Sequence, residues 1–112
     1  MNIQFKKGVL ELCVLSLLYH SEMYGYELTS KLSEAISISD GTIYPLLRRL
    51  KNEGYVSTYL SESNEGPPRK YYKLTETGTG YKDNLITEWN ALSRGVNRLI
   101  EGGTDNEQEG IS

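Results

Sequence analysis

The stretch SDGTIYPLLRRLKNEG, residues 39–54, decides the fold of this chain. Its apolar residues recur at the spacing i, i+3, i+4 and i+7, which is one stripe of a helix. They are Ile43, Leu46, Leu47 and Leu50. Ser39 stands at the N-cap position, where its hydroxyl can accept a backbone N–H of the first turn. Gly54 follows the last turn, where left-handed backbone geometry is favoured. The stretch therefore predicts one helix, held to the protein by its stripe.

The opposite face of this helix carries side chains that can donate to phosphates or read base edges. They are Thr42, Tyr44, Arg48, Lys51 and Asn52. Pro45 removes a backbone hydrogen bond inside the helix, at a cost of up to roughly 3 kcal/mol. Gly41, in the first turn, is also a poor helix former. A strong apolar stripe that persists despite both residues indicates a functional constraint.

The flanking segments predict two earlier helices and a later hairpin. Residues 8–19 (GVLELCVLSLLY) are apolar on most sides, so we expect a helix buried on more than one face. A second helix is expected over residues 24–35. Its inward positions would be Leu28, Leu32 and either Ala35 or Ile36. Residues 55–60 and 70–74 are rich in β-branched and aromatic types around a Gly/Pro/Asn/Ser loop, which predicts a β-hairpin.

Thr75 can cap a last helix over residues 76–101. Its apolar residues are spaced 4, 4, 3, 4 and 3 apart, which is a heptad-type seam. They are Tyr81, Leu85, Trp89, Leu92, Val96 and Leu99. Residues 102–112 form an acidic tail that we expect to be disordered. The order H-H-H-E-E-H, mainly α with a small β-hairpin, predicts a winged helix-turn-helix over residues 1–75 and a separate C-terminal helix.

Charge distribution is more informative than the net charge of −3 over 112 residues. The last twelve residues hold four acids and no base, which leaves 12 basic and 11 acidic groups, a net of +1, in residues 1–100. The basic residues gather in two places, Arg48, Arg49 and Lys51 in one and Arg69, Lys70 and Lys73 in the other. Either cluster alone is typical of a solvated face, but two clusters on a near-neutral body favour DNA binding.

Several function classes find no support in the composition. Cys13 and His20 are the single cysteine and histidine, too few for a structural metal site or a nucleophile–base pair. The carboxylates are scattered, so we expect neither an enzyme nor a cofactor. The apolar run 9–19 is interrupted by Glu11, lacks a cleavage site and is too short to span a bilayer. We therefore expect a cytoplasmic protein.

The sequence resembles the PadR family of bacterial transcriptional regulators. The matching segments are YGYEL (24–28), SDGTIYPLLRRLKNEGYV (39–56) and GPPRKYYKLTETG (66–78). The resemblance implies a winged helix with a C-terminal dimerisation helix over 76–101, in the short class of the family. It implies a homodimer that binds double-stranded DNA at palindromic operators, mostly as a repressor.

By position, the resemblance implies a set of DNA-contacting residues. They are Tyr24, Ser39, Gly41, Thr42, Tyr44, Arg48, Lys51, Arg69 and Lys70. Tyr24 would approach the DNA backbone from the second helix. Arg69 and Lys70 match the basic residues of the wing, which is the β-hairpin of this fold. Pro67 stands where a basic residue is common, so we expect this wing to grip phosphates less strongly.

The seam of the last helix predicts a homodimer, because a lone helix would expose a large apolar patch. The interface residues would be Leu85, Trp89, Leu92, Val96 and Leu99. Part of the seam could also lie on the first helix. A palindromic operator requires the same two-fold symmetry.

Some short-class PadR-like proteins bind flat aromatic drugs between paired tryptophans, and Trp89 falls at the matching position. Two indole rings across a two-fold axis could stack on a planar aromatic effector. The walls would be Glu11, Leu12, Leu15, Leu85 and Glu88, with Glu11 selecting a cation. The alternative is that Trp89 only fills the dimer core, which the bulk of Leu85 favours.

Two other functions compete with a PadR-like regulator. A MarR-like winged-helix regulator shares the LTETG-type entry to the last helix, but such proteins usually carry extra helices. A winged-helix module for protein–protein contact would not need the basic clusters around Arg48 and Arg69. A gel shift discriminates between DNA binding and protein contact.

Overall fold

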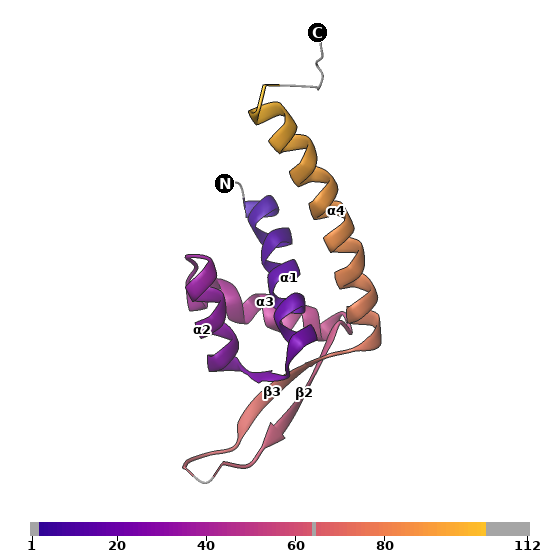
Figure 1. Cartoon of the computed structure of the whole chain (residues 1–112). Coiled ribbons are helices and arrows are strands. Elements are labelled where there is room, and N and C mark those ends of the chain that lie inside the picture. Colours follow the sequence, from indigo (N-terminus) through magenta and orange to yellow (C-terminus); the bar gives the residue numbers. More distant parts are fainter. Residues whose placement is uncertain (1–2, 64, 103–112) are drawn as a thin grey trace. The chain divides into compact units, whose positions relative to one another are not determined.

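Three helices, a hairpin and a last helix follow one another along the chain, which confirms the predicted order (Figure 1). The computed structural model describes residues 3–63 and 65–102, with side chains from residue 8 onward. The helices are α1 (Ile3–His20), α2 (Gly25–Ala35), α3 (Asp40–Asn52) and α4 (Glu76–Ile100). The chain divides into two compact units, Met1–Lys82 and Asp83–Ser112. The predicted tail over 103–112 lies outside the described residues.

The hairpin consists of β2 (Val56–Ser61) and β3 (Arg69–Leu74), which pair antiparallel from Val56 opposite Leu74 to Ser61 opposite Arg69. A two-residue strand β1 (Met23–Tyr24), absent from the sequence expectations, adds to the other edge of β3. Two residues are too few to show alternation, so only the free edge of β3 makes this segment a strand. The sheet order is β1-β3-β2.

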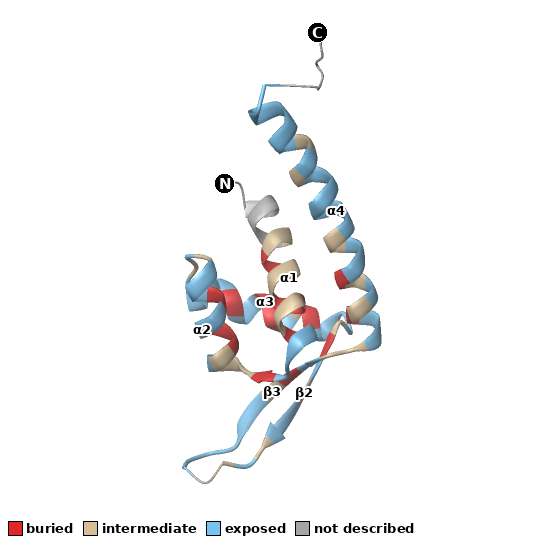
Figure 2. Cartoon of the chain, viewed as in Figure 1, coloured by how far each residue is buried: buried red, intermediate tan, exposed pale blue. Residues whose placement is uncertain are grey.

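The core of the first unit lies where α1, α2, α3 and the sheet meet, and its buried residues are red in Figure 2. The predicted stripe of α3 is fully or almost fully buried: Ile43, Leu46, Leu47 and Leu50. On α2 the inward positions Leu28 and Leu32 are buried, whereas Ala35 is exposed and Ile36 is half-buried. The helical periodicity therefore predicted correctly the buried face of α3 and two inward positions of α2, whereas neither Ala35 nor Ile36 is buried.

The helix α1 is longer than the predicted 8–19 and buries Leu10, Val14, Leu15 and Leu18. The charged Glu11 is also buried, at 6% exposure. Cys13 is half-buried, and its burial raises the pKa of the thiol. Glu11, the residue that interrupts the apolar run 9–19, is thus part of the core. Its buried charge needs a partner there.

The ends of α3 and α4 carry the predicted signals. Gly54 has φ +84°, the left-handed conformation expected after α3. The Thr75 hydroxyl accepts a hydrogen bond from the backbone N–H of Gly78 at 2.9 Å, which caps the first turn of α4 as predicted. These two residues set where α3 stops and where α4 begins.

The second unit contains the larger part of α4, and its apolar side chains are exposed in this chain. They are Trp89, Leu92, Val96, Leu99 and Ile100, with exposures from 40% for Trp89 to 78% for Leu99. Leu85 is half-buried, and Glu88 is exposed. Residues 83–102 of this unit therefore present an apolar surface.

No helix within the described part of the chain is long and apolar enough to cross a membrane. Residues 3–63 and 65–102 also contain no group of three His, Cys, Asp or Glu side chains that could hold a metal ion.

Candidate nucleic-acid interface

An open groove of about 420 Å³ lies in the first unit, between the start of α2, the exposed face of α3 and the start of β3. Five residues that the sequence assigned to DNA contact line it: Tyr24, Tyr44, Arg48, Arg69 and Lys70. Gly25, Tyr26 and Tyr72 complete the lining. The fold thus brings together cations and phenol groups from β1, α2, α3 and β3.

The exposed face of α3 is the one predicted from its stripe. Thr42, Tyr44, Arg48 and Lys51 are all exposed, opposite the buried leucines and isoleucine. Of these, Tyr44 and Arg48 line the groove, whereas Thr42 and Lys51 lie toward the two ends of the helix. The groove therefore occupies only the middle of the predicted recognition surface.

The N-terminal end of α3 differs from the prediction in one detail. Ser39 is the N-cap residue, but its hydroxyl makes no hydrogen bond to the backbone of the first turn. It lies 3.3 Å from the Thr42 hydroxyl instead, while the Ser39 carbonyl accepts the N–H groups of Thr42 and Ile43. The prediction of a side-chain cap was therefore wrong, because the Thr42 hydroxyl offered a competing partner.

Pro45 lies inside α3 without interrupting it, since the helix runs continuously from Asp40 to Asn52. The proline lacks an N–H for the carbonyl of Gly41, four residues earlier. Both Gly41 and Pro45 are exposed, so this turn of α3 lies at the protein surface. Water can satisfy the carbonyl, which explains how α3 tolerates the proline.

Tyr72 on β3 is the buried member of the groove lining, at 8% exposure. Burial raises the pKa of its hydroxyl, Tyr44 adds to the rise, and the Arg48 guanidinium opposes it. The residue was not among the sequence candidates. The sequence could have indicated Tyr72, because Lys70 and Tyr72 stand two apart on one strand and therefore share a face.

A row of three tyrosines crosses the sheet at one register position. Tyr24 on β1 pairs with Tyr71 on β3, which pairs with Tyr59 on β2. The ring centroids are 5.7 Å apart for Tyr24 and Tyr71 and 5.5 Å apart for Tyr71 and Tyr59. The guanidinium carbon of Arg69 lies 4.5 Å from the Tyr24 ring centroid, a cation–π geometry. The row therefore restrains Arg69 at the groove.

The far end of this row is tied to the segment after α1. The Tyr59 hydroxyl donates a hydrogen bond of 2.5 Å to Oε1 of Glu22, which raises the pKa of Tyr59. The Lys73 ammonium lies 4.0 Å from Oε2 of the same carboxylate. Glu22 thus joins both strands of the hairpin to the body of the unit.

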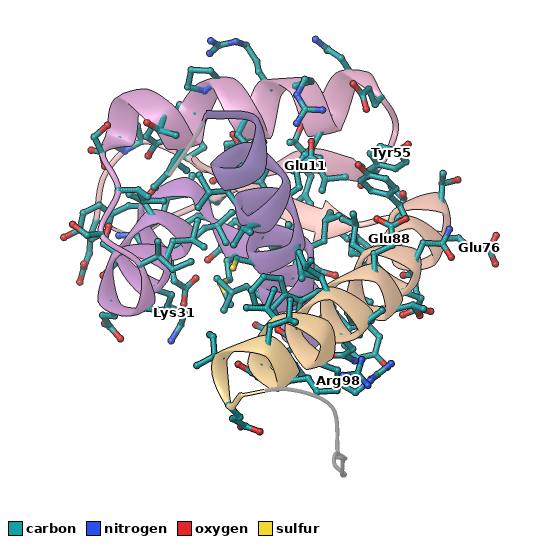
Figure 3. All side chains as sticks on the ribbon, turned by 90° about the horizontal axis from the view of Figure 1, so that it is seen from above. Glu11, Lys31, Tyr55, Glu76, Glu88 and Arg98 are labelled. Carbon is teal, nitrogen blue, oxygen red and sulfur yellow. The ribbon has the colours of Figure 1, made fainter. Side chains whose placement is uncertain are left out.

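Arg49 does not belong to the basic cluster in which the sequence placed it. Its guanidinium forms an ion pair with the buried Glu11 on α1, and Nη1 lies 3.3 Å from Oε2 of Glu53. In Figure 3 the Glu11 side chain reaches from α1 toward α3. The exposed cations of α3 are therefore Arg48 and Lys51, because the helical rotation turns Arg49 toward the core.

The residues of α1 that were assigned to a ligand site differ in exposure. Glu11 is engaged by Arg49 and by the Tyr81 hydroxyl, which donates to Oε1 at 2.7 Å. Leu15 is fully buried, and Leu12 is half-buried. Glu11 therefore already has two partners within the first unit.

Comparison with known proteins adds to this geometry. The model of the transcriptional regulator PadR-like family matches residues 14–84. An uncharacterized protein of Lysinibacillus sphaericus is 28% identical over 100 residues, covering 86% of this chain and 92% of that protein. The negative transcriptional regulator PadR of Bacillus subtilis is 32% identical over 74 residues, covering 62% of this chain and 41% of that protein.

Solved structures agree with the family match. A PadR-like transcriptional regulator of Bacillus cereus is 40% identical with a TM-score of 0.80, covering 88% of this chain and 98% of that one. A PadR-like transcription factor of Bacteroides fragilis is 43% identical with a TM-score of 0.74, covering 86% and 94%. On these matches the chain belongs to the PadR-like family and is a DNA-binding transcriptional regulator, not an enzyme.

Proposed function

We propose that the chain is a repressor that binds a palindromic operator as a homodimer, with α3 in the major groove and the hairpin on the flanking backbone. The groove carries the proposal, because it gathers Arg48, Arg69 and Lys70 beside the exposed face of α3. Phosphate contacts from these cations would position the helix, and base contacts would supply the specificity.

The site residues have distinct roles in this proposal. Ser39, Thr42 and Tyr44 would read base edges, with Arg48 reading a base or binding a phosphate. Gly41 would allow a close approach of the helix end to the DNA. Tyr24, Lys51, Arg69 and Lys70 would contact the backbone of the operator.

The repressor assignment is supported by the name of the Bacillus subtilis relative, a negative transcriptional regulator. The homodimer is supported by the exposed apolar surface of α4 in the second unit, formed by Trp89, Leu92, Val96 and Leu99 with half-buried Leu85 beside it. A surface of this kind on a small protein marks an interaction site. A C2 dimer would match the symmetry of a palindrome.

The proposal is tested by selecting DNA from a random library with the purified protein. We expect an inverted repeat with half-sites about one helical turn apart. If three cations per subunit contact phosphates, the dimer neutralises about six, and the log–log salt dependence has a slope of about −5. The double variant Tyr44→Ala/Arg48→Ala should lose the selected site. Binding at wild-type strength by that variant would refute the assignment of α3.

A second role, relief of repression by a planar aromatic effector, is supported by Trp89. Its indole is 40% exposed on the second unit, near half-buried Leu85 and exposed Glu88 on the same helix. Exposed indole faces stack on flat ligands. Trp89 is the only tryptophan, so its fluorescence reports directly on binding. Planar cationic dyes should quench it, and a diverse panel without quenching would leave Trp89 as a dimer-core residue.

A further inference from the structure

The segment after α3 and the start of α4 are joined by three close contacts. The Thr75 hydroxyl donates a hydrogen bond of 2.7 Å to the Gly54 carbonyl. The Thr75 N–H donates one of 3.2 Å to the Tyr55 carbonyl. Gly78 lies so close to this carbonyl that a Cβ at position 78 would overlap it. The backbone after α3 therefore has no room to slide along α4.

Side chains extend the same junction. The rings of Tyr55 and Tyr81 stack with centroids 4.2 Å apart and planes 8° from parallel. Tyr81 also donates its hydroxyl to Glu11 at 2.7 Å. Figure 3 shows Tyr55 and Glu11 on the side of the unit where α3 ends. One tyrosine of α4 thus contacts both the segment after α3 and the carboxylate of α1.

The buried carboxylate of Glu11 makes this junction a cooperative unit. At 6% exposure it cannot rely on water, so it needs the Arg49 guanidinium and the Tyr81 hydroxyl as partners. Removal of either partner leaves a buried charge that is only partly satisfied. The positions of Arg49 on α3 and Tyr81 on α4 are therefore set by the same acceptor.

We propose that Tyr81 is a positioning residue for DNA binding, which holds the angle of α3 through Glu11 and Arg49. The inference rests on the role of α3 in the proposed function and names what controls that role. Since α4 continues beyond Tyr81 to Ile100, a ligand or second copy that bends or turns α4 acts on α3 through this junction. Arg49 serves the junction and does not contact DNA.

The first experiment compares Tyr81→Phe with Tyr55→Phe. Both variants keep the stacked rings, but only the first removes the hydrogen bond to Glu11. On the DNA selected by the wild-type protein, we expect Tyr81→Phe to bind about fivefold or more weakly, the range of ordinary coupling between sites. Tyr55→Phe should bind as the wild-type protein does. Equal affinities of the two variants, both folded by circular dichroism, would overturn the proposal.

The second experiment separates positioning from contact by salt dependence. Arg69→Met should make the log–log slope less negative, because it removes a phosphate contact in each subunit. Arg49→Met should lower the affinity without changing this slope. A slope change in Arg49→Met equal to that in Arg69→Met would show that Arg49 contacts DNA, and would refute the proposal.

A third measurement needs no DNA and so remains decisive if no operator is selected. Amide hydrogen exchange at residues 49–53 should be about tenfold faster in Tyr81→Phe than in Tyr55→Phe, since a hydrogen bond to a charged group is lost. Unchanged exchange there would show that Tyr81 does not hold α3. The wild-type protein could select no DNA while exchange is still faster in Tyr81→Phe. That result would refute the proposed operator binding but not the junction.

Discussion

The phenol ring of Tyr44 on α3 lies against Gly25 at the start of α2, where an added Cβ would stand 3.3 Å from Cε1 of Tyr44. This distance is tighter than ordinary van der Waals contact. Tyr44 is 38% exposed, so its ring has room to move outward. Because Gly25 has no side chain, the ring of Tyr44, which we expect to read a base, can lie against this position.

Gly25→Ala should therefore separate DNA affinity from stability. The displaced Tyr44 ring should weaken operator binding about fivefold, a part of the energy of one good base contact. The free energy of unfolding should change by less than about 1 kcal/mol, because alanine suits a helix and the ring can yield. Gel shifts and thermal unfolding measure the two effects. Gly8→Ala is the control, since nothing lies within 4 Å of its added Cβ.

Two glycines of α4 should respond in opposite directions to the same substitution. Gly78→Ala should destabilise the protein by about 3 kcal/mol or more, because the new Cβ would overlap the Tyr55 carbonyl. Gly80→Ala should stabilise it by roughly 0.5–1 kcal/mol, since its Cβ meets open space in a helix. Denaturant unfolding of both variants checks this. A mild effect at position 78 would contradict the close approach of the two segments.

The groove predicts which cation of β3 binds DNA. Arg69 lines the groove and is held over Tyr24, whereas Lys73 lies beside Glu22 on the same strand. In a dimer, Arg69→Ala should make the log–log salt slope less negative by about 2, one phosphate per subunit. Lys73→Ala should leave the slope unchanged. Equal slopes for the two variants would show that the wing does not bind through this groove.

The exposed surface of α4 predicts the effect of a charge on association. Leu92→Glu should weaken the dimer by at least about a hundredfold, because the interface would bury an unpaired carboxylate. Leu60→Glu is the matched control, since Leu60 is 68% exposed on β2, outside the proposed interface. Analytical ultracentrifugation measures both. A dimeric Leu92→Glu would place the interface elsewhere.

Much of the fold was predictable from local patterns. The stripe of Ile43, Leu46, Leu47 and Leu50 gave the buried face of α3 and, by exclusion, its exposed face. Gly54 and Thr75 marked the ends of two helices through conformational preference and capping. These signals lie within a few residues of the feature that they predict. Helix propensity and periodicity are local properties, so one sequence suffices to read them.

The arrangement of the candidate site depended on contacts between distant segments. The sequence placed Arg49 with the exposed cations, but the buried Glu11, 38 positions earlier, draws it inward. Likewise, β1 exists because β3 offers it an edge, and that pairing brings Tyr24 beside Tyr71 and below Arg69. No pattern within a segment records which distant partner it will meet.

The apolar stripe of residues 39–54 thus predicted the helix α3 and its exposed face, and this stretch lies within the part of the chain that matches the family. Only the tertiary structure decided which cations of α3 are exposed and which one pairs with a buried carboxylate. The physical reason is that a buried charge must find its partner wherever the packed helices bring one within reach. For this protein the partners of Glu11 are Arg49 on α3 and Tyr81 on α4.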